Sequence, residues 1–126
     1  MNSITLKPEI SELYKLNEFI INELPEENLQ VILIVEEIFV NIVNYSETEF
    51  IIVNAEYDSS TLTIEFIDNG QKFNPLLTET LPLSDNIDEA QIGGLGIFLT
   101  KQLANELDYH YENGENHLKI IKKIEQ

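Results

Sequence analysis

Hydrophobic residues in the first third of the chain recur every three or four positions, which is the spacing of an amphipathic helix. Pro25 interrupts this pattern, and a proline at such a point ends a helix. The pattern therefore predicts two helices. The first is opened by Pro8 and Ser11, and the second runs from about Glu26 to about Tyr45.

The other regular segments are rich in β-branched and aromatic residues and predict strands. A long irregular stretch from Asn69 to Ile92 precedes a third helix that starts near Leu95, and a loop of that length is typical of a lid, a binding loop or disorder. The turns "DSS" and "NGEN" each join two neighbouring strands and predict two hairpins. The predicted strands are residues 4–6, 49–58, 61–68, 107–112 and 117–124.

These elements follow the order β-α-α-β-β-loop-α-β-β. Consecutive hairpins favour a mixed, largely antiparallel sheet, and about three amphipathic helices can cover one of its faces. We therefore expect a two-layer α/β sandwich that forms a single domain over residues 1–126.

The chain is strongly acidic, with a formal net charge of −16 and seven lysines as its only fixed cationic side chains. Such a charge repels nucleic acid and anionic membranes, so we expect neither as a partner. No cysteine is present, which excludes a disulfide scaffold and a thiolate metal site. The first residues do not resemble a signal peptide, and "VILIVEEIFVNIV" is too short and too acidic to span a bilayer. We expect a cytoplasmic protein.

The predicted second helix is apolar almost all round, so its few polar residues are informative. At about 100° per residue, the side chains of Gln30, Glu37, Asn41 and Asn44 fall within about 60° of one another. One interpretation is the solvated seam of a buried helix. The other is a binding stripe, because a carboxylate and an asparagine one turn apart suit a Mg²⁺ ion that also binds substrate phosphates.

The segment "IEFIDNGQKFNP" ends a predicted strand with Asp68 and Gly70 and continues to Phe73. Its residue types are those that ordinary turns require, so a plain turn is one interpretation. A ligand site is the alternative. An aspartate at the end of a buried strand can accept a hydrogen bond from an exocyclic amine such as that of adenine, and the glycine lets the backbone approach a flat ring.

Three glycines stand at the mouth of the predicted third helix, in the run Gly93-Gly94-Leu95-Gly96. The Lys-Ser/Thr of a Walker A loop does not follow them, and Leu99 replaces the third glycine of a dinucleotide fingerprint. A flexible hinge is one interpretation. An anion cradle is the other, because backbone N–H groups at a helix entrance could hold a triphosphate without arginine.

Together these motifs resemble the GHKL ATP-binding domains, which carry an N box and two glycine boxes on a Bergerat fold. Within that group, the closing stretch "GGLGIFLTKQLANELDYHYENGENHLKI" is most similar to the bacterial anti-sigma factor serine/threonine kinases of partner-switching systems. Sensor histidine kinases share the boxes but need a separate phospho-accepting helical domain, for which this chain has no room. The matching motifs are, in order, Glu37-x-x-x-Asn41, Asp68-x-Gly70-x-x-Phe73-Asn74-Pro75 and Gly93-Gly94-Leu95-Gly96-Ile97.

The resemblance implies a role for each matching residue. Asn41 would coordinate a Mg²⁺ ion that bridges the ATP phosphates, and Glu37 would take the proton from an attacking hydroxyl. Asp68 would hydrogen-bond the adenine amine, with Gly70 giving the ring room. The glycine cluster would offer backbone amides to the phosphates, and residues 69–92 would form the lid. The remaining nucleotide contacts are expected from Asn44, Phe73, Gly93, Gly94, Leu95 and Gly96.

The same resemblance implies protein partners. The phosphoryl acceptor would be a serine or threonine of an anti-anti-sigma (STAS-type) protein, and the same surface would alternately sequester a sigma factor. The first predicted helix would be a surface for a homodimer or another partner.

One departure from the family pattern concerns the arginine that relatives often place beside the second glycine box, because this chain reads "DEAQIGG" there. Lys72 or Lys101 could replace it only in part, since lysine lacks the planar fork of arginine.

Two other functions stay open. The chain could be a non-catalytic regulatory module that binds a nucleotide, or only a protein, and acts by sequestration. It could also be an ATPase in which Glu37 activates water as the acceptor. The missing arginine favours the non-catalytic module, whereas Glu37 and Asn41 on one helix face favour a catalytic protein.

Overall fold

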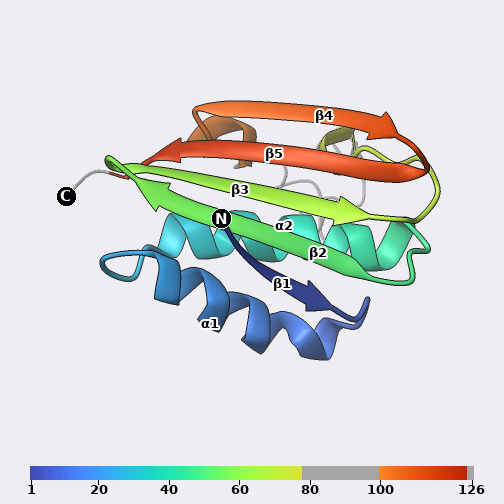
Figure 1. Ribbon diagram of the computed structural model, residues 1–126, viewed down its shortest axis with the longest axis horizontal. Coiled ribbons are helices and arrows are strands. Elements are labelled where there is room, and N and C mark those ends of the chain that lie inside the picture. Colours follow the sequence, from blue (N-terminus) through green and yellow to red (C-terminus); the bar gives the residue numbers. More distant parts are fainter. Residues whose placement is uncertain (78–99, 125–126) are drawn as a thin grey trace, which may run out of the picture.

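Five strands form one antiparallel sheet in the order β1-β2-β3-β5-β4 (Figure 1). The computed structural model describes residues 1–77 and 100–124 of the chain. The prediction of a largely antiparallel sheet is confirmed, because every strand pair within these residues is antiparallel. The strands are β1 (Asn2–Leu6), β2 (Ile51–Asp58), β3 (Thr61–Asp68), β4 (Glu106–Glu112) and β5 (Glu115–Lys123).

Two long helices, α1 (Leu13–Glu23) and α2 (Leu29–Tyr45), lie together on one face of the sheet, which confirms the two-layer α/β sandwich (Figure 1). A short 3₁₀ turn, η1 (Ile10–Glu12), leads into α1. The helix α2 begins three residues later than the sequence predicts, because Asn28 is its N-cap. The Asn28 side chain accepts a hydrogen bond from the Val31 N–H at 3.1 Å.

The core lies between α2 and the inward face of the sheet. Along β3, buried residues alternate with half-buried ones, and seven residues of α2 are buried. Val35, Ile38 and Phe39 are fully buried, and burial of such side chains contributes about 1.5–3 kcal/mol each to folding. The core therefore holds α2 in one orientation, and its polar residues keep fixed positions relative to the sheet.

Two tight turns set the strand register. Ser59 and Ser60 have positive φ angles of 52° and 65°, and Asn113 and Gly114 have φ angles of 53° and 77°. Positive φ at both central residues is the geometry of the two-residue turn that suits a hairpin. The pairing of β3 with β5, which neither turn joins, places Asp68 at the end of β3 directly opposite Asn116 near the start of β5.

Part of the predicted lid and the start of the third helix lie outside the described residues. The described edges of this region are residues 69–77, which end in the 3₁₀ turn η2 (Pro75–Leu77), and residues 100–103, which are helical. Within the part of the chain that the structure describes, no helix is long and apolar enough to cross a membrane.

Candidate functional site

Asp68 is a buried carboxylate whose orientation is fixed by hydrogen bonds. Three groups donate to its Oδ1 atom: the Ser46 hydroxyl at 2.5 Å, the Gly70 N–H at 2.9 Å and the Asn116 side-chain amide at 3.0 Å. The side chain is 1% exposed. None of these three donors contacts the second carboxylate oxygen, Oδ2. Oδ1 therefore holds the Asp68 carboxylate in place through these three hydrogen bonds, and Oδ2 takes no part in them.

Asn116 connects the Asp68 carboxylate to the turn that follows β3. Its amide nitrogen also donates to the carbonyl oxygen of Gln71 at 2.8 Å, and its oxygen accepts from the Phe73 N–H at 2.9 Å and the Tyr109 hydroxyl at 2.5 Å. Burial raises the pKa of the Tyr109 hydroxyl, which keeps it a hydrogen-bond donor. The side chain of Asn116 is thus satisfied entirely by protein groups.

Sequence reasoning missed Asn116. A signal was present, because Asn116 shares the inward-facing side of β5 with Leu118 and Ile120, where a polar residue needs an internal partner. Sequence reasoning also missed Ser46, the buried C-cap of α2. Nothing local distinguishes that serine, because its partner Asp68 is 22 positions away.

Gly70 lies against the carboxyl end of α2. A Cβ atom at Gly70 would stand 2.1 Å from both the carbonyl oxygen and the hydroxyl oxygen of Ser46. Gln71 donates from its backbone to the Ser46 carbonyl at 2.8 Å and from its side chain to the Tyr45 carbonyl at 2.9 Å. Packing against Ser46 therefore explains why glycine stands at this position. Its predicted role beside a ligand ring stays a prediction.

Phe73 also meets the end of α2. Its ring centroid lies 5.7 Å from that of Tyr45, with the planes tilted by 45°. The residue is half-buried, so part of its surface stays accessible.

Asn41 is the most buried member of the polar stripe on α2. It is 3% exposed, and its Nδ2 atom has no hydrogen-bond partner among residues 1–77 and 100–124. Leaving a buried polar atom unpaired costs about 1–3 kcal/mol, which a bound group could recover. A 180° turn of the carboxamide would present Oδ1 at the same position, so Asn41 can offer either a donor or an acceptor. An oxygen ligand for a hard cation such as Mg²⁺ fits this position.

Glu37 lies one turn before Asn41 and is half-buried. Burial raises the pKa of its carboxyl, and the nearby charge of Glu36 raises that pKa further. No hydrogen bond or ion pair joins Glu37 to any of the described residues. A raised pKa makes an ionised carboxylate a stronger base, which suits proton abstraction. Gln30 and Asn44, the other members of the stripe, are exposed.

The structure brings three of the predicted residues, Asp68, Gly70 and Phe73, to the carboxyl end of α2. Asp68 and Phe73 contact the carboxyl end of α2 through Ser46 and Tyr45, and Asn41 lies about 7.5 Å earlier along the helix axis than Ser46. The structure does not test the glycine cluster, because Gly93, Gly94, Leu95 and Gly96 lie outside the described residues.

Comparisons with known proteins show which family and fold the chain belongs to. Residues 15–122 match the family described as the histidine kinase-like ATPase domain. The serine/threonine-protein kinase BtrW of Bordetella bronchiseptica is 32% identical over 59 residues, which are 47% of this chain and 42% of that protein. The match therefore spans less than half of that relative. The histidine kinase AdeS of Acinetobacter baumannii shares the fold, with a TM-score of 0.56, 12% identity and coverage of 100% of this chain and 69% of that one.

Replacing Gly70 with alanine is expected to destabilise the protein. The new Cβ would overlap backbone and hydroxyl atoms of Ser46, and relieving such overlap typically costs about 1–3 kcal/mol. Urea denaturation would measure the change in the free energy of unfolding. Gly114→Asn is the matched control, because that glycine has open space around it and asparagine tolerates its positive φ. An unchanged midpoint for Gly70→Ala would contradict the close approach.

Replacing Glu37 with glutamine is expected to stabilise the fold at neutral pH. Because the folded-state pKa is raised, the ionised carboxylate lowers the free energy of unfolding above its ordinary pKa. This penalty disappears at lower pH, where both states are protonated. Thermal denaturation as a function of pH should show a higher Tm for Glu37→Gln at pH 7 and a shrinking difference toward acid. The exposed control Glu18→Gln should show no such trend. A lower Tm for Glu37→Gln at pH 7 would contradict the assignment.

Proposed function

Because this chain belongs to the histidine kinase-like ATPase domain family, we propose that it binds Mg-ATP and transfers the terminal phosphoryl group to a serine or threonine of a partner protein. One observation carries the proposal. A buried, unpartnered asparagine amide lies one helical turn from a carboxylate whose pKa is raised, on a helix that the core holds in place. The local likeness to a protein named as a serine/threonine kinase supports a hydroxyl acceptor.

Asp68 would bind the base of the nucleotide. Its Oδ1 atom is held by three donors, so Oδ2 would accept the hydrogen bond from the adenine amine. The half-buried Phe73 ring would contact the base from the side. Because Asn116 and Ser46 fix the carboxylate, little side-chain entropy would be lost when the base binds.

Asn41 and Glu37 would act at the phosphate end. A Mg²⁺ ion held by Asn41 would supply neutralisation of phosphate charge, with Gly94, Leu95 and Gly96 predicted to add backbone amides. Glu37 would accept the proton of the attacking hydroxyl, and its raised pKa suits that task. The protein's contribution to phosphoryl transfer is then mainly positioning and charge neutralisation.

The partners belong to the same proposal. The acceptor would be an anti-anti-sigma (STAS-type) protein, and a sigma factor would be the alternative partner, in a cytoplasmic regulatory switch. The resemblance of the sequence to anti-sigma factor kinases supports this assignment. A homodimer through α1 is a further part of the proposal, supported by the exposed side chains of Tyr14 on that helix and of Ile10 in the preceding turn η1.

A non-catalytic binding module is the second candidate, and one observation favours it. Lys72 is a residue that could replace the missing arginine, but its ammonium group lies 6.0 Å from the centroid of the Tyr111 ring. The phosphates would then depend on backbone amides and the metal for charge neutralisation. Such a module would bind nucleotide without turnover.

Calorimetric titration of the protein with ATP, with and without Mg²⁺, tests the proposal directly. We expect binding that requires Mg²⁺ and weakens at least about tenfold in Asn41→Ala, because a ligand to the metal is lost. Asn22→Ala, an exposed asparagine on α1, is the control. Absence of binding at millimolar Mg-ATP would refute nucleotide binding.

Glu37→Ala should keep the affinity and lower ATP turnover by about 10²–10⁴. Unchanged turnover would refute the assignment of Glu37 as the base.

Replacing Asp68 with asparagine should keep the hydrogen bonds of this residue within the protein and weaken its binding of adenine. The asparagine Oδ1 can still accept the three existing hydrogen bonds, and its amide nitrogen would then occupy the position of Oδ2. A donor would face the adenine amine, so we expect ATP affinity to fall about a hundredfold, with GTP much less affected because guanine presents an acceptor there. Calorimetry with both nucleotides measures this. Equal loss for ATP and GTP would contradict recognition of the base by Asp68.

A further inference from the structure

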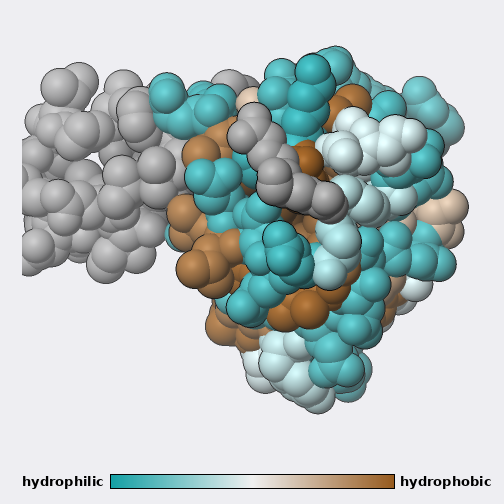
Figure 2. All heavy atoms as spheres, turned by 90° about the vertical axis from the view of Figure 1, so that its left-hand side faces the viewer, coloured by the Kyte–Doolittle hydropathy of each residue, from teal (hydrophilic) through white to brown (hydrophobic). Residues whose placement is uncertain are grey.

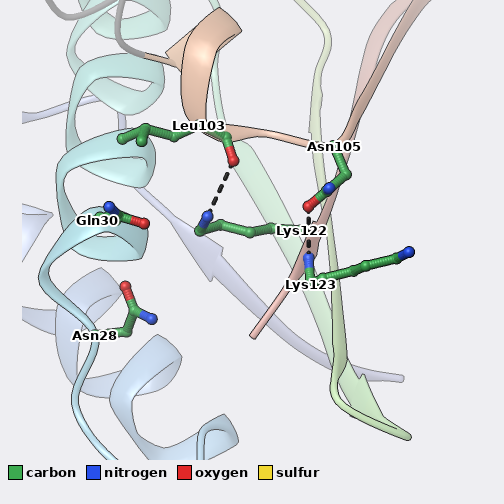
Figure 3. Close-up of a pocket in the computed structure, with 6 residues that line it drawn as sticks. All are labelled: Asn28, Gln30, Leu103, Asn105, Lys122 and Lys123. Atoms are coloured by element: carbon green, nitrogen blue, oxygen red, sulfur yellow. Dashed lines mark hydrogen bonds between the residues drawn. The ribbon is translucent and has the colours of Figure 1, made fainter. Parts of the chain in front are cut away.

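The end of the molecule at which α2 begins carries polar side chains interspersed with hydrophobic ones (Figure 2). A cavity of about 360 Å³ opens there, between the first turn of α2 and the end of β5. Figure 3 shows the Gln30 side chain extending from α2 toward Lys122 on β5. The cavity is lined by Asn28, Gln30, Leu103, Asn105, Lys122 and Lys123.

Lys122 gives the cavity its positive charge. Its ammonium group donates to the carbonyl oxygen of Leu103 at 3.0 Å, which holds the side chain in place. An ammonium group has three donors, and among residues 1–77 and 100–124 the Leu103 carbonyl is the one acceptor bonded to it. Lys123 contributes mainly through its backbone. Its N–H donates to the Asn105 side chain at 2.7 Å, while its side chain points away from Gln30 (Figure 3).

This local charge contrasts with the rest of the chain, whose formal net charge is −16. The first turn of α2 also carries no acidic residue. Carboxamide groups from Asn28, Gln30 and Asn105 add neutral hydrogen-bonding capacity beside the lysine. A carboxylate side chain satisfies this combination of one fixed cation and several amides.

The cavity and Asp68 lie at opposite ends of α2. Asp68 contacts the carboxyl end of the helix through Ser46, whereas Asn28 and Gln30 belong to its beginning. Glu37 and Asn41 lie between, and Gln30 shares their helical face at about 10 Å before Glu37 along the axis. A nucleotide whose base is at Asp68 and whose phosphates are at Asn41 therefore points its terminal phosphate toward the cavity.

We propose that this cavity anchors an acidic side chain of the protein substrate while the substrate's hydroxyl group faces Glu37. This inference rests on the proposed function, because it needs the phosphates at Asn41. The separation of about 10 Å corresponds to about three residues of extended chain at 3.3 Å each. The substrate would therefore carry a glutamate or aspartate about three residues from the accepting serine or threonine.

Leu29 extends the docking surface beside the cavity. It lies between two of the lining residues in sequence and is 75% exposed, more than any other large hydrophobic side chain among the described residues. A hydrophobic side chain beside a polar pocket is a common arrangement at protein interfaces, where it adds contact area around a specific anchor. The substrate would cover Leu29 when its acidic residue enters the cavity.

Nuclear magnetic resonance titration of the ¹⁵N-labelled protein, saturated with a non-hydrolysable Mg-ATP analogue, tests the proposal. The probes are short capped serine peptides with one glutamate about three residues before or after the serine, and a matched peptide with glutamine in its place. We expect one glutamate peptide to shift the amide signals of Gln30, Leu103, Asn105 and Lys122 and to bind at least about tenfold more tightly than the glutamine peptide. Equal affinity of the glutamate and glutamine peptides would overturn the inference.

Two variants and one control complete the test. Lys122→Met should remove the preference for glutamate, while Lys119→Met, which makes the same charge change at an exposed position of β5 outside this cavity, should keep it. Gln30→Glu should also remove the preference by adding a like charge, and an acidic residue in the first turn favours the helix, so folding is retained. A preference that survives in Lys122→Met and Gln30→Glu would overturn the inference. Calorimetry of Mg-ATP on the same samples separates the two proposals, because lost nucleotide binding refutes the proposed function itself.

Discussion

The fold and the site both depend on how the carboxyl end of α2 meets the end of β3. Ser46 caps the helix and donates to Asp68, and Gly70 approaches the Ser46 backbone so closely that no side chain fits between them. Asn116 joins β5 to the same point. This contact acts together with the hydrophobic core, which holds the rest of α2 and so fixes where its polar residues lie relative to the sheet.

Two residues of the proposed site lower the stability of the fold. Asn41 leaves an amide nitrogen buried without a partner, and burial raises the pKa of Glu37. Either residue would be replaced by a hydrophobic one if α2 served packing alone, because its other faces are apolar. The surrounding core offsets these costs. By contrast, protein groups hold the Oδ1 atom of Asp68 and both polar atoms of the Asn116 side chain, so these two side chains are fixed in position within the fold.

The charge of the molecule is unevenly distributed along this site. The chain has a formal net charge of −16, so the proposed phosphate-bearing ligand would need backbone amides or a metal ion to offset that charge. Lys122 is a residue of β5 that lies beside the beginning of α2, whereas Asp68 lies at the other end of that helix. The Lys122 ammonium group is held by a hydrogen bond to the Leu103 carbonyl oxygen. In the proposed complex, the base, the phosphates and the acceptor would follow one another in the direction from Asp68 through Asn41 and Glu37 to Lys122.

The sequence by itself determined the order of the elements, the two hairpins and the polar stripe of α2, because each depends on spacing between near neighbours in the chain. The beginning of α2 was placed too early, since the cap by Asn28 competes with the residues before it. Only the tertiary structure decided that Ser46 and Asn116 hold Asp68, and that Gly70 is needed by the protein itself. It also brought Lys122 to the first turn of α2. These contacts join residues far apart in sequence, and such pairings follow from strand register and helix packing rather than from any local pattern.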